Sequence, residues 1–173
     1  FIRHFFNSTI IAGGIAQINL LIDTIFASLL GEGSPTWLYV SDRLIQFPLG
    51  IFAIAIGTVL LPTLARSFAK NDIADFTLSL TKAFKLIFFL AFPSVIGLII
   101  FAEPILGTIF QRGEFLWSDV ENSSLSLIGF AMGLPFFMAM KVLVPAFFSR
   151  QDTKTPMMVA GISLILNVKF FIF

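Results

Sequence analysis

The sequence predicts an all-α integral membrane protein, a polytopic bundle of about five transmembrane helices. Of its 173 residues, 57% are hydrophobic and 12% are charged, whereas soluble domains carry about 25% charged residues. The mean hydropathy is +0.97. Apolar runs recur along the whole chain, and the connections between them alternate in charge, as loops on the two sides of a membrane do.

The apolar runs predict a single membrane domain over residues 1–173, which we expect to be partial. The predicted spans cover residues 5–30, 36–68, 78–101, 124–148 and 156–173. Each approaches or exceeds the ~20 residues that a helix needs to cross ~30 Å of hydrocarbon. Because the last run, FFIF, stops in the middle of an apolar segment, we expect an internal segment of a longer protein.

The connections carry the orientation signal. Basic residues surround the first run's start, the second connection and the last one, whereas the third connection is mainly acidic. The positive-inside rule therefore predicts a cytoplasmic N-terminus, with the acidic connection on the opposite side. The basic residues are Arg3, Arg66, Lys70, Lys82, Lys85, Arg150 and Lys154, and the acidic ones are Glu103, Glu114, Asp119 and Glu121, with Arg112 among them.

The first span is amphipathic. At the angular step of an α-helix, a carboxylate and an amide share a narrow stripe with three alanines, whereas isoleucines cover the other side. Small and polar residues are also common where membrane helices pack together. Asp23 is harder to explain by packing, because a buried carboxylate is costly in a membrane. The stripe consists of Ala12, Ala16, Asn19, Asp23 and Ala27.

The second span, residues 36–68, carries charge where hydrocarbon is expected. Seven residues share roughly a third of its helical wheel, although Pro48 can bend the helix and shift the register below it. An arginine in hydrocarbon is costly unless it faces water, a partner or a ligand, so Arg43 marks a candidate functional site. The seven residues are Thr36, Tyr39, Asp42, Arg43, Gln46, Gly50 and Gly57.

The turn GEGSP predicts that the first two spans form an antiparallel hairpin. Asp23 and Arg43 then lie at matching depth, ~12 Å from the outer end. Two interpretations remain open. One is a structural ion pair of Arg43 with Asp23 or with Asp42, and the other is a cavity in which arginine binds an anion and Asp23 binds a cation.

The later segments read mainly as scaffold. Residues 78–101 are nearly free of polar groups, and ILGTIFQRGEF is expected to lie along the outer interface as a short segment. Asp119 resembles an acidic residue in the first turn of a helix. Gly129 and Gly133 form a close-packing pattern that is only weakly diagnostic. In the last span, Asn167 lies deep in the predicted membrane region.

Several function classes lack their signatures. The sequence contains no phosphate-binding loop, no HExxH pair and no GxSxG nucleophile motif, so it does not predict an enzyme. It contains no cysteine, which excludes disulfides and thiolate metal sites. Its Lys and Arg residues mark membrane ends and do not form a nucleic-acid-binding surface.

Three segments carry a family resemblance. SDRLIQFPLGIFAIAIGTVLLPTLARSFA, FQRGEF and FFSRQDTKTP follow one another in the order found in the MurJ/MviN lipid II flippases of the MOP superfamily, which they resemble. The resemblance implies a fold of two six-helix lobes around a central cavity, followed by two further helices. It implies that this chain is the start of the second lobe, with the first-lobe helices as its missing partners.

The resemblance also implies a function and a site. The family moves the undecaprenyl-pyrophosphate-linked peptidoglycan precursor from the inner to the outer leaflet of the bacterial cytoplasmic membrane for cell-wall synthesis. Arg43 matches the cavity arginine of the second lobe, and Asp42 matches the neighbouring acid. Gln46 stands where many members have glutamate. Cation coupling is implied as well, with Na⁺ as the expected ion and the oxygens of Asp23 and Asn167 as expected ligands.

Two other functions remain open at the level of the sequence. A transporter of the same superfamily could carry other lipid-linked polysaccharides or cationic drugs, although a carrier of organic cations favours acidic cavity residues over Arg43. A membrane scaffold without transport is the other alternative. It requires Arg43 to be neutralised permanently within a closed bundle.

Overall fold

The computed structural model describes residues 14, 17–18, 21–22, 24–25, 28–29 and 33–172, with the side chains at 164 and 167–172 left out. All the regular structure in this part of the chain is helical. The predicted all-α membrane class is therefore confirmed. Three stretches of the described chain are long and apolar enough to cross a membrane: Ser34–Ala69, Ile73–Ile100 and Trp117–Ser149.

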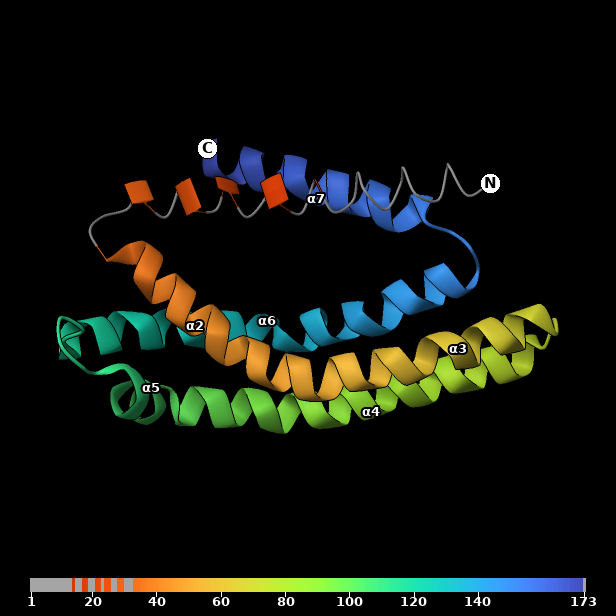
Figure 1. Ribbon diagram of the computed structural model, residues 1–173, viewed down its shortest axis with the longest axis horizontal. Helices are drawn as coiled ribbons and strands as arrows, with labels where there is room; N and C mark the ends of the chain where they lie inside the picture. Colours follow the sequence, from red (N-terminus) through yellow and green to blue (C-terminus); the bar gives the residue numbers. More distant parts are fainter. Residues whose placement is uncertain are drawn as a thin grey trace.

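Figure 1 shows the order of the helices. A long first unit consists of α2 (Ser34–Pro48), the π-helix η1 (Leu49–Ile54) and α3 (Ala55–Ala69). It is followed by α4 (Ile73–Ile100), the short α5 (Ala102–Phe110), α6 (Trp117–Ser149) and α7 (Lys154–Ile172). Because α5 only bridges the end of α4 and the start of α6, the unit α2–η1–α3 and α6 run in the same direction and α4 runs against them.

The long first unit bends where the sequence predicts a bend. Pro48 closes α2, and its ring removes one backbone donor from the helical ladder. The next residues, Leu49–Ile54, form a π-helix, in which hydrogen bonds reach one residue further than in an α-helix. α2 and α3 therefore slope differently in Figure 1.

Local capping fixes the starts of α4 and α6. The carboxylate of Asp72 accepts a hydrogen bond from the backbone N–H of Asp75 at 2.9 Å, which caps α4. At α6, the carboxylate of Asp119 accepts one from the backbone N–H of Leu116 at 2.8 Å. The prediction that Asp119 lies in the first turn of a helix is confirmed, and α6 begins at Trp117, before the predicted span at 124.

α6 is the central helix of the described bundle, since it packs against α2, η1, α3, α4 and α5. Its buried side chains include Leu127, Leu134 and Met138, each fully inaccessible, and they meet Leu64 of α3 and Ile87 of α4 in one core. In a membrane such helices are held together by close packing more than by the hydrophobic effect.

The outside of the bundle is as apolar as its core. Phe89 of α4 is 75% exposed and Phe136 of α6 is 72% exposed. Large exposed apolar patches on a soluble protein mark interaction surfaces. On helices of this length they fit hydrocarbon, which agrees with a multi-pass membrane protein.

α7 packs only lightly against the rest of the bundle, with its recorded contacts made to α6. Figure 1 shows it on the far side of α6 from α4. A tight turn connects it to α6, with Gln151 in the left-handed region at φ 59°. Asp152 then caps α7. Its carboxylate accepts hydrogen bonds from the backbone N–H groups of Lys154 and Thr155 at 3.1 and 3.0 Å.

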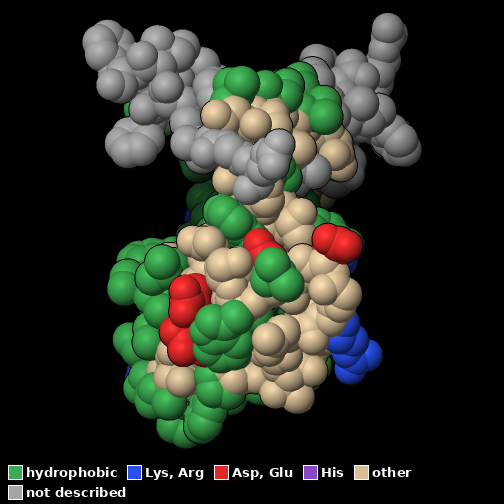
Figure 2. All heavy atoms as spheres, turned by 90° about the vertical axis from the view of Figure 1, so that its left-hand side faces the viewer, with side chains coloured by type: hydrophobic (Ala, Val, Ile, Leu, Met, Phe, Trp, Pro, Cys, Tyr) green, Lys and Arg blue, Asp and Glu red, His purple; other side chains and the backbone are tan. Residues whose placement is uncertain are grey.

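Apart from Asp42, Arg43 and Lys141, most charged residues of the described chain lie toward the two ends of the bundle. The acidic end holds Glu103, Glu114, Asp119 and Glu121, and Figure 2 shows acidic side chains standing out among apolar ones on this face. The basic end holds Arg66, Lys70 and Arg150. There, the guanidinium of Arg150 stacks over the ring of Phe76 at 5.3 Å from its centroid, which ties the end of α6 to the start of α4.

The cap at Asp152 gives a first prediction. The hydrogen bond from the Thr155 hydroxyl, at 2.6 Å, is the main cause that lowers the pKa of Asp152 below its ordinary value of 3.8. A lowered pKa means that the cap persists at neutral pH and is lost only as the pH falls below 3.8 through the folded-state value. At pH 8, Asp152→Ala is expected to speed tryptic cleavage after Arg150 or Lys154 by about fivefold, as loss of one N-cap does.

The measurement uses purified full-length protein in detergent and follows the cleavage by mass spectrometry. Thr153→Ala, in the same turn, is the matched control. Equal cleavage rates for wild type and Asp152→Ala would show that this carboxylate does not hold the connection.

Candidate functional site

The first five residues of the predicted polar stripe, those between positions 36 and 46, lie on α2 and face away from the bundle. Its five members are exposed, whereas Trp37, Val40, Ser41 and Ile45 are buried or half-buried on the opposite side of the helix. The structure thus brings together the residues that the sequence singled out. These are Thr36, Tyr39, Asp42, Arg43 and Gln46, called the Arg43 stripe below.

Arg43 is held by its neighbour one turn earlier. One terminal guanidinium nitrogen donates a hydrogen bond to the hydroxyl of Tyr39 at 2.8 Å. The guanidinium also lies over the Tyr39 ring, 4.9 Å from its centroid. A guanidinium has five N–H donors. This contact therefore fixes the orientation of the guanidinium, and most of its N–H donors are not used by Tyr39.

Asp42 does not form the local ion pair with Arg43 that the sequence left open. Its carboxylate instead accepts a hydrogen bond from the side-chain amide of Gln46, one turn later. Consecutive residues of a helix point about 100° apart, so Asp42 and Arg43 lean to different sides of the stripe. The stripe therefore contains two separate pairs, Arg43 with Tyr39 and Gln46 with Asp42.

Gly57 does not belong to the stripe, and its assignment to the same third of the wheel was wrong. A side chain there would meet α6, because an ideal Cβ lies only 3.0 Å from the backbone oxygen of Lys141. The cause is the π-helix between Gln46 and Gly57, whose angular step per residue is smaller than that of an α-helix. α3 is thereby turned relative to α2.

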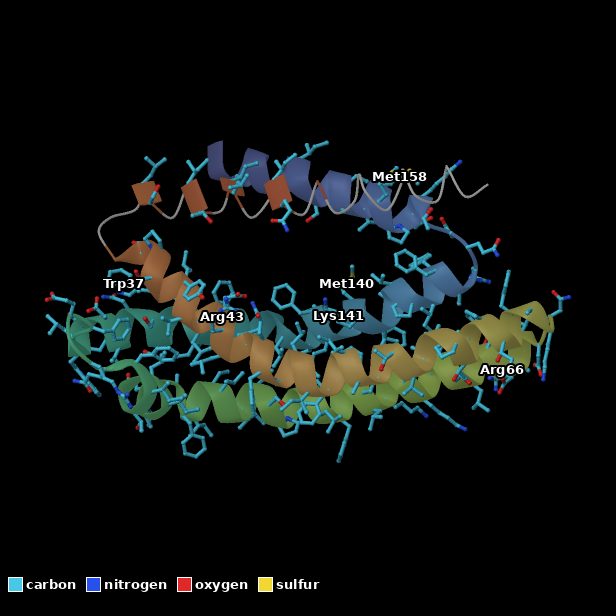
Figure 3. The ribbon with its side chains drawn as sticks, viewed as in Figure 1. Trp37, Arg43, Arg66, Met140, Lys141 and Met158 are labelled. Atoms are coloured by element: carbon cyan, nitrogen blue, oxygen red, sulfur yellow. The ribbon has the colours of Figure 1, made fainter. Side chains whose placement is uncertain are left out.

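The packing side of α2 carries polar contacts that the sequence analysis missed. The indole N–H of Trp37 donates to the carboxylate of Asp119 at 2.8 Å, and the hydroxyl of Ser41 lies 2.8 Å from the backbone oxygen of Ser123. Both link α2 to α6 across 82 residues of sequence. Figure 3 shows Trp37 nearer than Arg43 to the acidic end of α2.

The two residues proposed as cation ligands cannot be placed. Asp23 and the side chain of Asn167 both lie outside the described residues. Gln17, Thr24 and Ser28 of the same span are described, and all three are exposed. The hydroxyl of Ser28 donates to the backbone oxygen of Ile25 at 2.6 Å.

A shallow groove of about 480 Å³ lies between α3 and α4, away from the Arg43 stripe. Its walls are mainly apolar, with polar side chains from Thr63, Ser79 and Lys82. Such a surface fits the lipid-facing side of a helix pair whose lysine extends toward the basic end. It shares no residue with the stripe.

Comparison with known proteins identifies the family. The family model described as "Lipid II flippase MurJ" matches residues 1–173. A probable lipid II flippase MurJ of Vibrio cholerae is 46% identical over 154 residues, which is 89% of this chain and 29% of that protein. A probable lipid II flippase MurJ of Haemophilus influenzae is 45% identical over 162 residues, covering 90% of this chain and 32% of that protein.

A solved structure agrees with the sequence comparison. The lipid II flippase MurJ in its inward closed conformation superposes with a TM-score of 0.81 at 30% identity, covering 95% of this chain and 36% of the solved one. The chain thus spans about a third of the length of the proteins it matches. By family model, sequence identity and fold alike, the chain belongs to the lipid II flippase MurJ family.

Proposed function

We propose that this chain is part of a flippase that moves a lipid-linked peptidoglycan precursor from the inner to the outer leaflet of the bacterial cytoplasmic membrane. The relatives named as lipid II flippases support the substrate class. The observation that carries the proposal is Arg43, an exposed arginine on a helix that is apolar enough to span a membrane. Burying such a charge is costly, so it requires an aqueous path or an anionic ligand.

Arg43 would bind the pyrophosphate of the substrate. A guanidinium is planar and offers paired N–H donors that match two oxygens of a phosphate. The stack on Tyr39 holds the guanidinium before the ligand arrives, which lowers the entropy lost on binding. Gln46 is neutral, and its side-chain amide donates a hydrogen bond to the Asp42 carboxylate. The stripe therefore repels an incoming anion less than it would with glutamate at position 46, which would add a second carboxylate.

Transport of this kind breaks no covalent bond, so the proposal assigns binding roles and no catalytic residue. The partners are the bilayer, the lipid-linked precursor and the remaining part of the full-length protein, including the first-lobe helices. Nucleic acid is not among them.

A chimera tests the proposal with a defined background. The matching segment of the Vibrio cholerae relative, which is 46% identical, is replaced by the part of this chain that aligns with it. Expression of the chimera is expected to restore growth to a strain depleted of its own flippase. A chimera that reaches the membrane at the normal level and does not restore growth would contradict the proposed function.

We also propose that Na⁺ drives the cycle through oxygen ligands from Asp23 and Asn167. Carboxylate and amide oxygens suit a hard cation. In the full-length protein, Asp23→Asn keeps the size of the side chain and removes its charge. Transport by this variant is expected to lose its dependence on the Na⁺ gradient. If that dependence is unchanged, Asp23 is not a ligand of the coupling ion.

For orientation, we propose that the basic end is cytoplasmic and the acidic end faces outward. A cysteine at Glu114, an exposed loop position, is expected to react with a membrane-impermeant thiol reagent added to intact cells, and one at Lys70, also exposed, is not. Gly33 is unsuitable as a probe position, because its φ is +94° and the Trp37 ring lies 2.9 Å from an ideal Cβ. The reverse labelling pattern would invert the proposed topology.

A further inference from the structure

We propose that Asp119 is a positioning residue: through Trp37 it sets the rotation of α2 about its axis, and so the direction in which Arg43 points. The inference rests on the proposed role of Arg43 in binding the precursor. It assigns a function to a carboxylate on a different helix. The hydrogen bonds of that carboxylate go to Trp37 and Leu116 and to no member of the Arg43 stripe.

Both oxygens of Asp119 are engaged. Oδ2 accepts the backbone N–H of Leu116 at 2.8 Å, which fixes the carboxylate relative to the first turn of α6. Oδ1 accepts the indole N–H of Trp37 at 2.8 Å. A carboxylate that only capped α6 would need one of these bonds. The second bond connects the cap to α2, and a charged acceptor makes it stronger than a neutral one.

A second contact lies one turn below the first. The Ser41 hydroxyl is fully buried and lies within 2.8 Å of two backbone oxygens, those of Trp37 and Ser123. Trp37 and Ser41 are four residues apart and therefore lie on the same face of α2. Together the two contacts fasten one face of α2 to α6, and we call them the α2–α6 clamp.

The clamp lies at the upper end of α2, and the helix changes type just below its lower end. Pro48 contributes no backbone N–H, and the π-helix that follows has a hydrogen-bond pattern different from that of the helices on either side. Gly57, beyond the π-helix, fixes α3 against Lys141 of α6. The rotation of α3 is thus set by its own contact with α6, and that of α2 is set by the clamp together with the buried side chains of Val40 and Ile45.

The clamp and the stripe lie on opposite sides of the same helix. Arg43 is two positions after Ser41, which places it roughly 200° around the helix. A rotation of α2 on α6 would therefore carry Arg43 away from the open side and bring buried positions such as Val40, 6% exposed, toward it. Without Asp119, the guanidinium of Arg43 is still present, but its direction relative to the bundle is no longer fixed.

The test uses two clamp variants and two matched controls in the full-length protein, with any cysteine outside residues 1–173 replaced by serine. Trp37→Phe keeps a ring and removes the indole donor, and Asp119→Asn keeps the size and loses one acceptor. The controls are Trp117→Phe and Glu121→Gln. Trp117→Phe removes, and Glu121→Gln weakens by removing the charge, the same kind of bond, an indole N–H to a carboxylate at 2.9 Å. This bond lies within α6 and does not reach α2.

The readout is the rate at which single cysteines react with N-ethylmaleimide. A cysteine at Val40 reports the face of α2 that packs on the bundle, and one at Ala131, fully buried in α6, reports the core. The clamp variants are expected to raise the Val40 to Ala131 rate ratio by about fivefold, the change equivalent to one net hydrogen bond. The control variants are expected to leave it unchanged. The clamp variants are also expected to complement growth more weakly than wild type, and the controls to complement it normally.

Two outcomes would overturn the inference. If the rates at Val40 and Ala131 rise together, Asp119 serves stability only. If neither rate rises in the clamp variants, α2 is held by other contacts. The thiol rates do not depend on transport. A failure of the proposed function, in which Arg43→Ala still supports growth, is therefore distinguishable from a failure of the clamp.

Discussion

Replacing Arg43 by alanine in the full-length protein is expected to abolish growth of a flippase-depleted strain, and Arg43→Lys is expected to fail nearly as badly. Lysine keeps the charge but offers a single ammonium in place of a planar fork, so it cannot make two parallel bonds to one phosphate. Loss of one bond to a charged group weakens binding by roughly 10- to 100-fold. The lysine variant also loses the hydrogen-bonded stack on Tyr39.

A conservative change at Tyr39 separates the role of its hydroxyl from the role of its ring. Tyr39→Phe retains the ring under the guanidinium and removes the hydroxyl that lies 2.8 Å from it. It is expected to weaken activity mildly, by about fivefold or less, because the lost hydrogen bond is exposed to solvent and the ring contact with the guanidinium remains. Arg66→Ala, an exposed arginine at the basic end, is the matched control for loss of a positive charge and is expected to complement growth.

Membrane levels measured by immunoblot accompany each growth assay. Normal growth with Arg43→Ala at a normal level would remove the substrate-binding role. A structural ion pair with Asp23 predicts another pattern. Arg43→Lys would then largely substitute, and Asp23→Asn combined with Arg43→Gln would function better than either single change.

The sequence was sufficient for the features that depend on local periodicity. The 3.6-residue repeat places Thr36, Tyr39, Asp42, Arg43 and Gln46 on one side of a helix, and the structure has all five exposed on that side. Pro48 predicts the bend by a local rule, since proline removes a donor wherever it stands in a helix. The cap at Asp119 follows equally from the first turn of α6.

Tertiary contacts were beyond that reasoning. The bond from Trp37 to Asp119 joins residues 82 apart, and no spacing rule connects them. Its only local signals were an indole donor near the start of a span and an acid at a helix start. Wheel analysis also fails beyond Pro48, because it assumes 100° per residue and the chain adopts a π-helix there. That is why Gly57 was placed on the polar stripe and lies against α6.

The glycine pattern on α6 shows the same limit. Gly129 has no atom within 4 Å of an ideal Cβ, and the ideal Cβ of Gly133 meets the ring of Phe137 on its own helix, at 3.0 Å. Within the described residues, neither glycine marks a close approach of two helices. The close approach occurs at Gly57, which no GxxxG spacing identified.

Gly57→Leu is expected to destabilise the full-length protein strongly and to lower its membrane level. An ideal Cβ at this position lies 3.0 Å from the backbone oxygen of Lys141 and 3.9 Å from Cγ of Pro145. A backbone oxygen in the middle of a helix cannot move aside as a flexible side chain can. Overpacking at such a site costs about 1–3 kcal/mol, and a leucine has three further heavy atoms to place.

A series at this position distinguishes packing from helix propensity. Gly57→Ala gains about 1 kcal/mol of helix propensity, which offsets the shift of a few tenths of an ångström that its Cβ requires. It is therefore expected to be nearly neutral, whereas Gly57→Leu is expected to lower the thermal midpoint by several degrees in detergent. Gly97→Leu is the matched control, because no atom lies within 4 Å of an ideal Cβ at Gly97 of α4. If Gly57→Leu is as stable as Gly97→Leu, α3 and α6 are not in close contact at Gly57. The proposal that this contact fixes α3 against α6 would then be wrong.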